Sequence, residues 1–117
     1  MKKKQLLVTD KEVRRLFNNF NKEYFDNSLS KEMRIEFVRN PMVGKDRVDG
    51  YQLGEDIVLR ESLRSHYDSV VITLIHEMIH ADLPHYVGNR RMAGVHGTIF
   101  QAKVVQLFNA GIYDGLL

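Results

Sequence analysis

The residues best suited to chemistry are two histidines and a glutamate in the segment His76-Glu77-Met78-Ile79-His80. On a helix, residues four apart lie on one face one turn apart, so both imidazoles would reach the same metal ion. Glu77 is offset from His76 by about 100°, so it would contact a metal-bound water instead of the metal. This spacing is typical of a catalytic zinc site in which the glutamate acts as general base and acid.

The helix that must position these residues is predicted over Val70 to Leu83, with Asp68 or Ser69 as its cap and Pro84 near its end. Nearly every other position around its circumference is apolar, so this helix is expected to be central and buried. Burying two imidazoles and a carboxylate without partners would be costly, and a metal ion would satisfy them. The alternative is a pair of hydrogen-bonded histidines without metal, and the single polar strip of a buried helix favours the metal.

A third ligand is expected, because a catalytic zinc ion usually has three protein ligands and one open position. No glutamate follows Glu77, and Leu83 and Tyr86 stand where an extended motif would need glycine and histidine, so two common ligand patterns are excluded. The remaining candidates are His66, Asp82, His85, His96 and Asp114. Among them His96 is favoured, because it opens the last predicted helix and Gly97 beside it permits close approach.

The elements around the motif helix predict an α+β domain. A first helix begins at the capping box formed by Thr9 and Glu12 and ends near Asn27 and Ser28. Three short strands are predicted to form a small sheet, at 33–38, 48–53 and 55–59. The strand at 55–59 is the predicted edge along which an extended substrate would add.

The C-terminal part is predicted as a loop followed by a helix. The loop contains His85, which is expected to be exposed, and the helix runs from about His96 to Ala110. Its predicted inner face carries Phe100, Val104, Leu107 and Phe108. The order of elements is therefore helix, strands, motif helix and C-terminal helix.

Length and composition indicate one globular domain over residues 1–117, with residues 1–8 as a flexible basic tail. The chain has no cysteine, which excludes disulfides and a cysteine-based zinc ribbon. No apolar run approaches the roughly 20 residues of a membrane span, and Lys2 to Lys4 precede too few apolar residues for a signal peptide. A cytoplasmic monomer with no membrane partner is therefore expected.

The charge balance argues against a strong nucleic-acid groove. Without Lys2, Lys3 and Lys4, the chain has 14 basic and 15 acidic residues. The basic tail and the pair Arg90-Arg91 are the basic clusters that could supply DNA contact. Weak DNA contact is the most that this distribution predicts.

The motifs resemble those of a known family. His76-Glu77-Met78-Ile79-His80-Ala81, followed by His96-Gly97-x-x-Phe100, is similar to the SprT-like metallopeptidase domain of the Spartan proteases. The segments Phe20–Leu29 and Ile57–Leu59 resemble the end of that family's first helix and the strand before its motif helix. The resemblance covers about residues 10–110, in a minimal form that lacks the family's zinc ribbon.

This resemblance implies a zincin-like fold, one Zn²⁺ per chain held by His76, His80 and His96, and Glu77 as the catalytic acid/base. It implies a protein or peptide substrate, and Spartan-type members cleave proteins crosslinked to DNA. The alternative is a non-catalytic, zinc-stabilised protein- or DNA-binding module on the same fold. Glu77 favours catalysis, because a structural site gains little from a carboxylate beside its ligands. Candidates for stabilising the oxyanion are Tyr86, Arg90 and Tyr113, with no preference among them.

Overall fold

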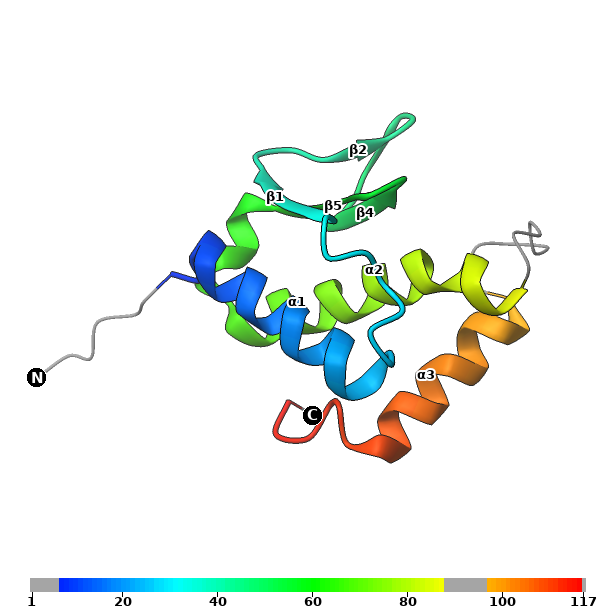
Figure 1. Ribbon diagram of the computed structural model, residues 1–117. Helices are drawn as coiled ribbons and strands as arrows, with labels where there is room; N and C mark the ends of the chain where they lie inside the picture. Colours follow the sequence, from blue (N-terminus) through cyan, green and yellow to red (C-terminus); the bar gives the residue numbers. More distant parts are fainter. Residues whose placement is uncertain (1–6, 88–96, 117) are drawn as a thin grey trace, which may run out of the picture.

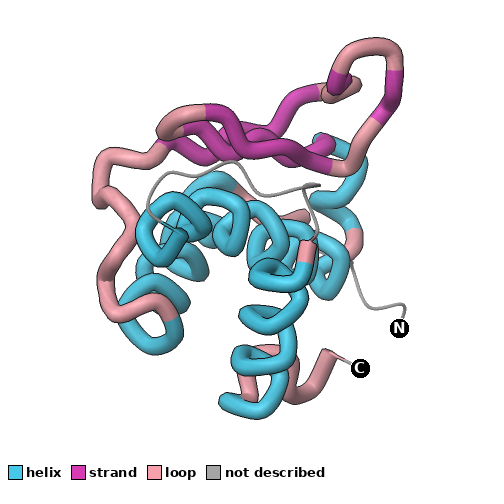
Figure 2. The backbone as a smooth tube through the Cα atoms, turned by 90° about the vertical axis from the view of Figure 1, so that its right-hand side faces the viewer, coloured by secondary structure: helices cyan, strands magenta, loops and turns pink. Residues whose placement is uncertain are grey.

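The computed structural model describes residues 7–87 and 97–116, with backbone alone for 84–87, and it has the predicted α+β architecture (Figure 1). The elements are α1 (Asp10–Tyr24), β1 (Arg34–Val38), β2 (Met42–Val43), β3 (Asp46–Arg47), β4 (Gly50–Leu53), β5 (Asp56–Arg60), the 3-10 helix η1 (Glu61–Ser65), α2 (Tyr67–Val87) and α3 (Thr98–Ala110). The sheet forms one layer and the three α-helices lie on one side of it (Figure 2).

Helix α1 begins as its capping sequence predicts. The Thr9 hydroxyl oxygen accepts a hydrogen bond from the backbone N–H of Glu12 at 3.1 Å. The helix ends before Asp26 and Asn27, whose φ angles of 53° and 56° reverse the chain. The side chain of Asn21 both donates to and accepts from the backbone of Leu29, at 3.0 and 3.1 Å, and so binds the following loop to the helix.

The chain is anchored upstream of α1 at Val8. The sequence places this residue in a flexible tail, whereas the structure buries it at 3% exposure. Its backbone N–H donates to the carbonyl of Arg64 at 2.8 Å, and its own carbonyl accepts from the Arg64 guanidinium at 2.8 Å. Lys2 to Lys4 lie outside the described residues.

The three-stranded sheet has the order β1-β5-β4, with β1 parallel and β4 antiparallel to β5. The prediction that residues 55–59 form the free edge is therefore wrong, because β5 is the central strand. Its Ile57, Val58 and Leu59 are all buried, as a continuous apolar run between two neighbouring strands should be. The order of strands in a sheet depends on contacts between segments that are distant in sequence. The alternation of residues within one strand therefore does not predict whether that strand is central or at the edge.

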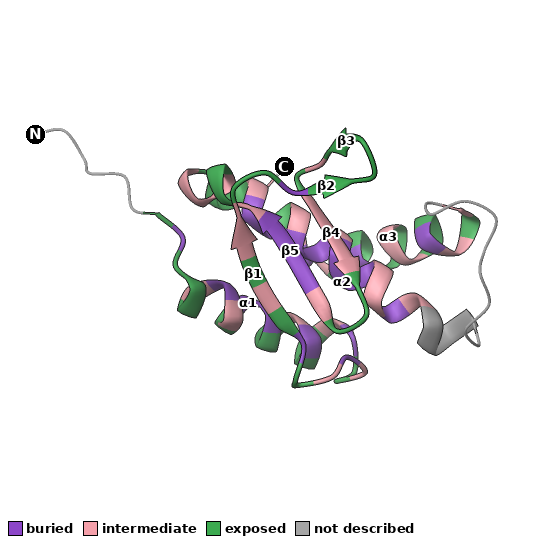
Figure 3. Cartoon of the chain, turned by 90° about the horizontal axis from the view of Figure 1, so that it is seen from above, coloured by how far each residue is buried: buried purple, intermediate pink, exposed green. Residues whose placement is uncertain are grey.

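A second ladder, between β2 and β3, is absent from the sequence prediction. It pairs Met42 with Arg47 and Val43 with Asp46 around Gly44, whose φ is 62°. Two residues per strand are too few to produce a detectable alternation. Seen from above, this hairpin lies beyond the start of β4 (Figure 3).

Helix α2 is central, as predicted, but longer at both ends. The backbone N–H of Val70 donates to the carbonyl of His66 at 3.0 Å, so His66 precedes the first turn, not Asp68 or Ser69. At the other end the helix passes through Pro84 to Val87, which places His85 in the helix and not in a loop. Pro84 has no N–H to donate to the carbonyl four residues before it, so the helix continues through this position with one hydrogen bond fewer.

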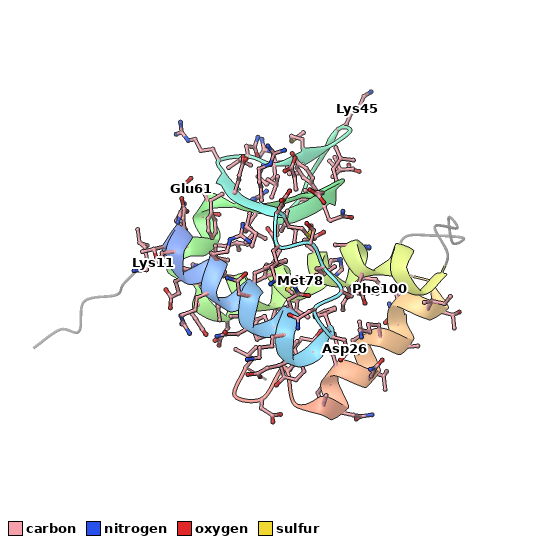
Figure 4. The ribbon with its side chains drawn as sticks, viewed as in Figure 1. Lys11, Asp26, Lys45, Glu61, Met78 and Phe100 are labelled. Atoms are coloured by element: carbon pink, nitrogen blue, oxygen red, sulfur yellow. The ribbon has the colours of Figure 1, made fainter. Side chains whose placement is uncertain are left out.

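One hydrophobic core joins the sheet to α1, α2 and α3. Six apolar residues of α2 are at most 2% exposed: Val70, Val71, Leu74, Ile75, Met78 and Ile79. Figure 4 shows Met78 in the middle of the molecule. This burial fixes the rotation of α2, and with it the direction of its polar strip.

Helix α3 has the predicted range and packs through Phe100 and Leu107, which are 3% and 1% exposed. The assignment of Phe108 to its inner face is wrong, because this residue is 56% exposed. Phe108 lies about 80° around the helix from Phe100, and its ring packs against Tyr113 with centroids 6.3 Å apart. Among the described helices, none has the length and apolar character to cross a membrane.

Candidate metal centre

The two histidines of the motif converge on one point. His76 and His80 lie one turn apart on α2, and their Nε2 atoms are 3.2 Å apart. Both residues are half-buried, while the apolar residues beside them on the helix are fully buried. The helix thus presents two imidazole nitrogens side by side at the surface of the core.

This spacing fits a shared zinc ion. Two nitrogens at 2.0–2.1 Å from a tetrahedral Zn²⁺ are themselves about 3.3 Å apart, close to the 3.2 Å between the Nε2 atoms. Neutral imidazole is also among the preferred zinc ligands. In the absence of metal, a contact at this distance requires that one Nε2 carry a proton and the other accept it. The donor set and its spacing therefore suit a zinc ion.

A phenylalanine from α3 completes a cluster of three rings with the histidines. The ring centroid of Phe100 lies 5.0 Å from that of His76 and 4.7 Å from that of His80. The two imidazoles are 4.8 Å apart at an interplanar angle of 72°. Figure 4 shows Phe100 where α3 meets α2, so the first turn of α3 lies against the motif.

Glu77 lies beside the pair and is 5% exposed. Burial disfavours the carboxylate and raises the pKa of Glu77 to about 7. A carboxyl group with this pKa exchanges protons near neutral pH. This is the behaviour required of a general base and acid.

The edge strand β4 approaches α2 at Thr73. A Cβ atom added at Gly50 would lie 2.7 Å from the carbonyl oxygen of Val58 and 3.0 Å from Cγ2 of Thr73. Thr73 precedes His76 by one turn on the polar strip. The absence of a side chain at Gly50 therefore lets the edge of the sheet approach the motif helix closely (Figure 3).

Comparison with known protein families identifies the domain. The sequence profile of the SprT-like family matches residues 13–113, nearly the whole chain. The chain belongs to the SprT-like family. The family is one of metallopeptidase-type domains and is generally associated with zinc. No curated protein and no solved structure matches the chain.

No third metal ligand is found beside His76 and His80 among the side chains that the structure describes. Within that part of the chain, no group of three or more histidine, aspartate or glutamate side chains is arranged to hold a metal ion. His96 lies outside the described residues; it is joined directly to Gly97, the N-cap of α3. His96 therefore stays a prediction.

The other candidates for the third ligand lie elsewhere. His66 precedes α2 and is ten residues, or about 15 Å along the axis, from His76. The Asp82 carboxylate accepts a hydrogen bond from the Ser28 hydroxyl at 2.5 Å, in the contact between α2 and the loop that follows α1. Asp114 follows the C-terminal end of α3, while Phe100, in its first turn, contacts the histidines.

None of the three candidates for stabilising an oxyanion is placed beside the histidines by the described residues. Tyr113 lies beyond the C-terminal end of α3 and packs against Phe108, so it is remote from the histidines. Arg90 is outside the described residues, and for Tyr86 the backbone alone is described, in the last turn of α2. The feature that the sequence did not predict is the contact of one phenylalanine ring with both histidines; the spacing between His96 and Phe100 was its only signal.

Proposed function

We propose that this SprT-like domain is a zinc-dependent endopeptidase. The observation that carries the proposal is the 3.2 Å separation of the two Nε2 atoms beside the buried Glu77. His76, His80 and His96 would hold one zinc ion per chain. Zinc in such a site polarises a carbonyl oxygen and lowers the pKa of a bound water toward ~7.

Glu77 performs the proton transfers in this proposal. Its carboxylate takes a proton from the attacking water and delivers it to the amine of the leaving peptide. The placement of Glu77 supports this role, because it follows His76 directly and lies about 100° around the helix from it. It therefore lies near the histidines without sharing their face of α2.

The substrate is proposed to bind as an extended strand along β4, which replaces the segment 55–59 in this role. The backbone N–H of Arg60 donates to the carbonyl of Asp49 at 2.7 Å. Since hydrogen-bonded pairs alternate along an antiparallel ladder, the backbone polar groups of Gly50 and Gln52 point away from β5. A peptide added there would hydrogen-bond to these two residues and pass over α2.

DNA-bound or DNA-crosslinked proteins are the proposed substrate class. Membership of the SprT-like family supports this substrate class. Within the sequence itself, the support consists of two basic clusters, Lys2 to Lys4 and Arg90-Arg91. Addition of a peptide through its backbone selects little by sequence, which suits cleavage of varied proteins. DNA would then act by holding the protein substrate near the site.

The deciding experiment compares the wild type with Glu77→Gln. Both proteins should bind one zinc ion per chain, because Glu77 is not a proposed ligand. Cleavage of an unstructured protein, followed by gel and mass spectrometry, should fall at least a hundredfold in the variant. Each reaction is run with and without single-stranded DNA and with a DNA-crosslinked substrate.

Two outcomes would contradict the proposal in different ways. Equal and measurable cleavage by both proteins would remove Glu77 from the mechanism. Zinc binding without cleavage under any of the conditions would support the alternative, a zinc-stabilised binding module. Cleavage that is indifferent to DNA would retain the endopeptidase and remove the proposed substrate class.

A further inference from the structure

The ring cluster at the metal centre joins two helices that are separate in sequence. His76 and His80 come from α2, and Phe100 comes from the first turn of α3. Phe100 is 3% exposed, and the centroids of its ring and the two imidazoles are all between 4.7 and 5.0 Å apart. One apolar side chain therefore packs against both proposed ligands at once.

A metal site depends on the orientation of its ligands as well as on their positions along a helix. The second side-chain torsion of histidine is broad and roughly two-fold. The helix backbone alone therefore leaves each imidazole several directions. Productive sites hold their ligands to within about 0.5 Å and 10–20°, so something must restrict these torsions before the metal binds.

Phe100 meets this requirement by packing. Its ring is inclined at 59° to the imidazole of His76 and at 37° to that of His80. Rotation of either imidazole would break its close contact with the Phe100 ring, which is itself held in the core at 3% exposure. The ring thus favours the arrangement in which the two Nε2 atoms face each other.

From this geometry we infer that Phe100 is a positioning residue that orients His76 and His80 for metal binding. The inference rests on the proposed zinc site, but not on the proposed cleavage of proteins. Residues that orient ligands commonly change metal affinity 10–100-fold when they are replaced.

The test compares Phe100→Leu with Leu107→Val in the full-length protein. Both are apolar truncations at buried positions of α3, and Leu107 contributes no ring to the cluster. Zinc affinity is measured by competition with a chromophoric chelator, and unfolding of the metal-free proteins is measured in EDTA. Phe100→Leu should weaken zinc binding at least tenfold, whereas Leu107→Val should change it less than twofold despite a similar loss of thermal stability.

A second readout follows the imidazoles themselves. In NMR spectra of the metal-free protein, the ring protons of His76 and His80 should shift in Phe100→Leu, because the ring current of Phe100 is lost. Phe100→Tyr, which keeps the ring, should retain an affinity within about threefold of the wild type. If Phe100→Leu does not fold, Phe100→Met replaces it, since methionine fills a similar space without a ring.

Two results would overturn the inference. One is wild-type zinc affinity in the folded Phe100→Leu or Phe100→Met protein. The other is an equal loss of affinity in Leu107→Val, which would reduce Phe100 to an ordinary core residue. Neither result depends on proteolysis, so failure of the inference and failure of the proposed function are distinguishable.

Discussion

The motif helix α2 and the edge strand β4 approach each other at Thr73 and Gly50, but different kinds of interaction determine the position of each. The residues of α2 that would bind metal lie within five consecutive positions, so helical geometry places them one turn apart on one face, and their Nε2 atoms lie 3.2 Å apart. The position of β4 depends on pairing with β5 and on the contact between Gly50 and Thr73. The positions of the proposed metal ligands thus depend on residues close in sequence, whereas the proposed substrate strand depends on residues distant in sequence. Mutations in α2 should therefore change zinc affinity, and mutations in β4 should change cleavage without changing zinc affinity.

The largest effect is expected on the α2 side of this comparison. His76→Ala removes one of the two nitrogens that face each other, and it should weaken zinc binding by about a thousandfold or more. The matched control is His66→Ala, at an exposed residue before the first turn of α2. Chelator competition should find wild-type affinity in this control. Similar losses in both variants would show that helix stability, and not ligation, controls zinc binding.

The next effect tests the direction of the backbone groups in β4. Tyr51 directs its N–H toward β5, so Tyr51→Pro loses a ladder bond and should destabilise the protein by about 3 kcal/mol. Gln52 directs its N–H to the free edge, so Gln52→Pro should cost less than about 1 kcal/mol. Urea unfolding checks this difference.

Cleavage extends the same comparison. Gln52→Pro should lower the rate of proteolysis about tenfold, because one hydrogen bond to the substrate backbone is lost. Its zinc affinity should not change. Wild-type cleavage by a folded Gln52→Pro protein would show that substrate does not add to β4.

The same contrast explains what the sequence predicts well. Thr9, the period of α2 and the range of α3 are local signals, and the structure bears them out. The motif residues fall on the polar strip because the apolar positions around them fix the rotation of the helix. The match to the SprT-like family confirms the resemblance that these residues carry.

The errors have a common physical origin. The apolar segment Ile57 to Leu59 predicts a strand but not its place in the sheet. This strand is central because it pairs with both β1 and β4. Phe108 is apolar but lies outside the arc that packs on α2, and Pro84 lies in a helix that continues past it to Val87. Each depends on a neighbour distant in sequence or on helix length, which residue type alone does not specify.

The next prediction concerns the effect of Glu77 on how the stability of the metal-free protein depends on pH. The pKa of Glu77 is raised in the folded state to about 7 from an ordinary value of 4.5. The folded state therefore holds a proton that the unfolded state has lost, so stability falls as pH rises from 4.5 to 7 and then levels off. The full change attributable to Glu77 is about 3 kcal/mol.

Urea unfolding in EDTA between pH 4 and 8 would measure this change, with Glu77→Gln as the reference. The difference between the two proteins reports on Glu77, because groups distant from it contribute equally to both profiles. Wild type should lose stability relative to the variant as pH rises. If the free energies of unfolding of the two proteins changed in parallel with pH, Glu77 would be solvated. The α2 site would then not be more buried than the β4 edge.

The last effect is expected where the two regions touch. In Gly50→Ala, the new Cβ would lie 2.7 Å from the Val58 carbonyl oxygen on β5 and 3.0 Å from Thr73 Cγ2 on α2, so β4 must shift relative to both neighbours. The cost should be about 2 kcal/mol, against less than about 0.5 kcal/mol for Leu53→Ala, whose side chain is 73% exposed on the same strand. Because the shift moves the edge and leaves the imidazoles in place, KM for a protein substrate should rise while zinc affinity stays constant. A fall in zinc affinity would instead show that β4 supports the ligands through Thr73, and the two regions would then form one unit.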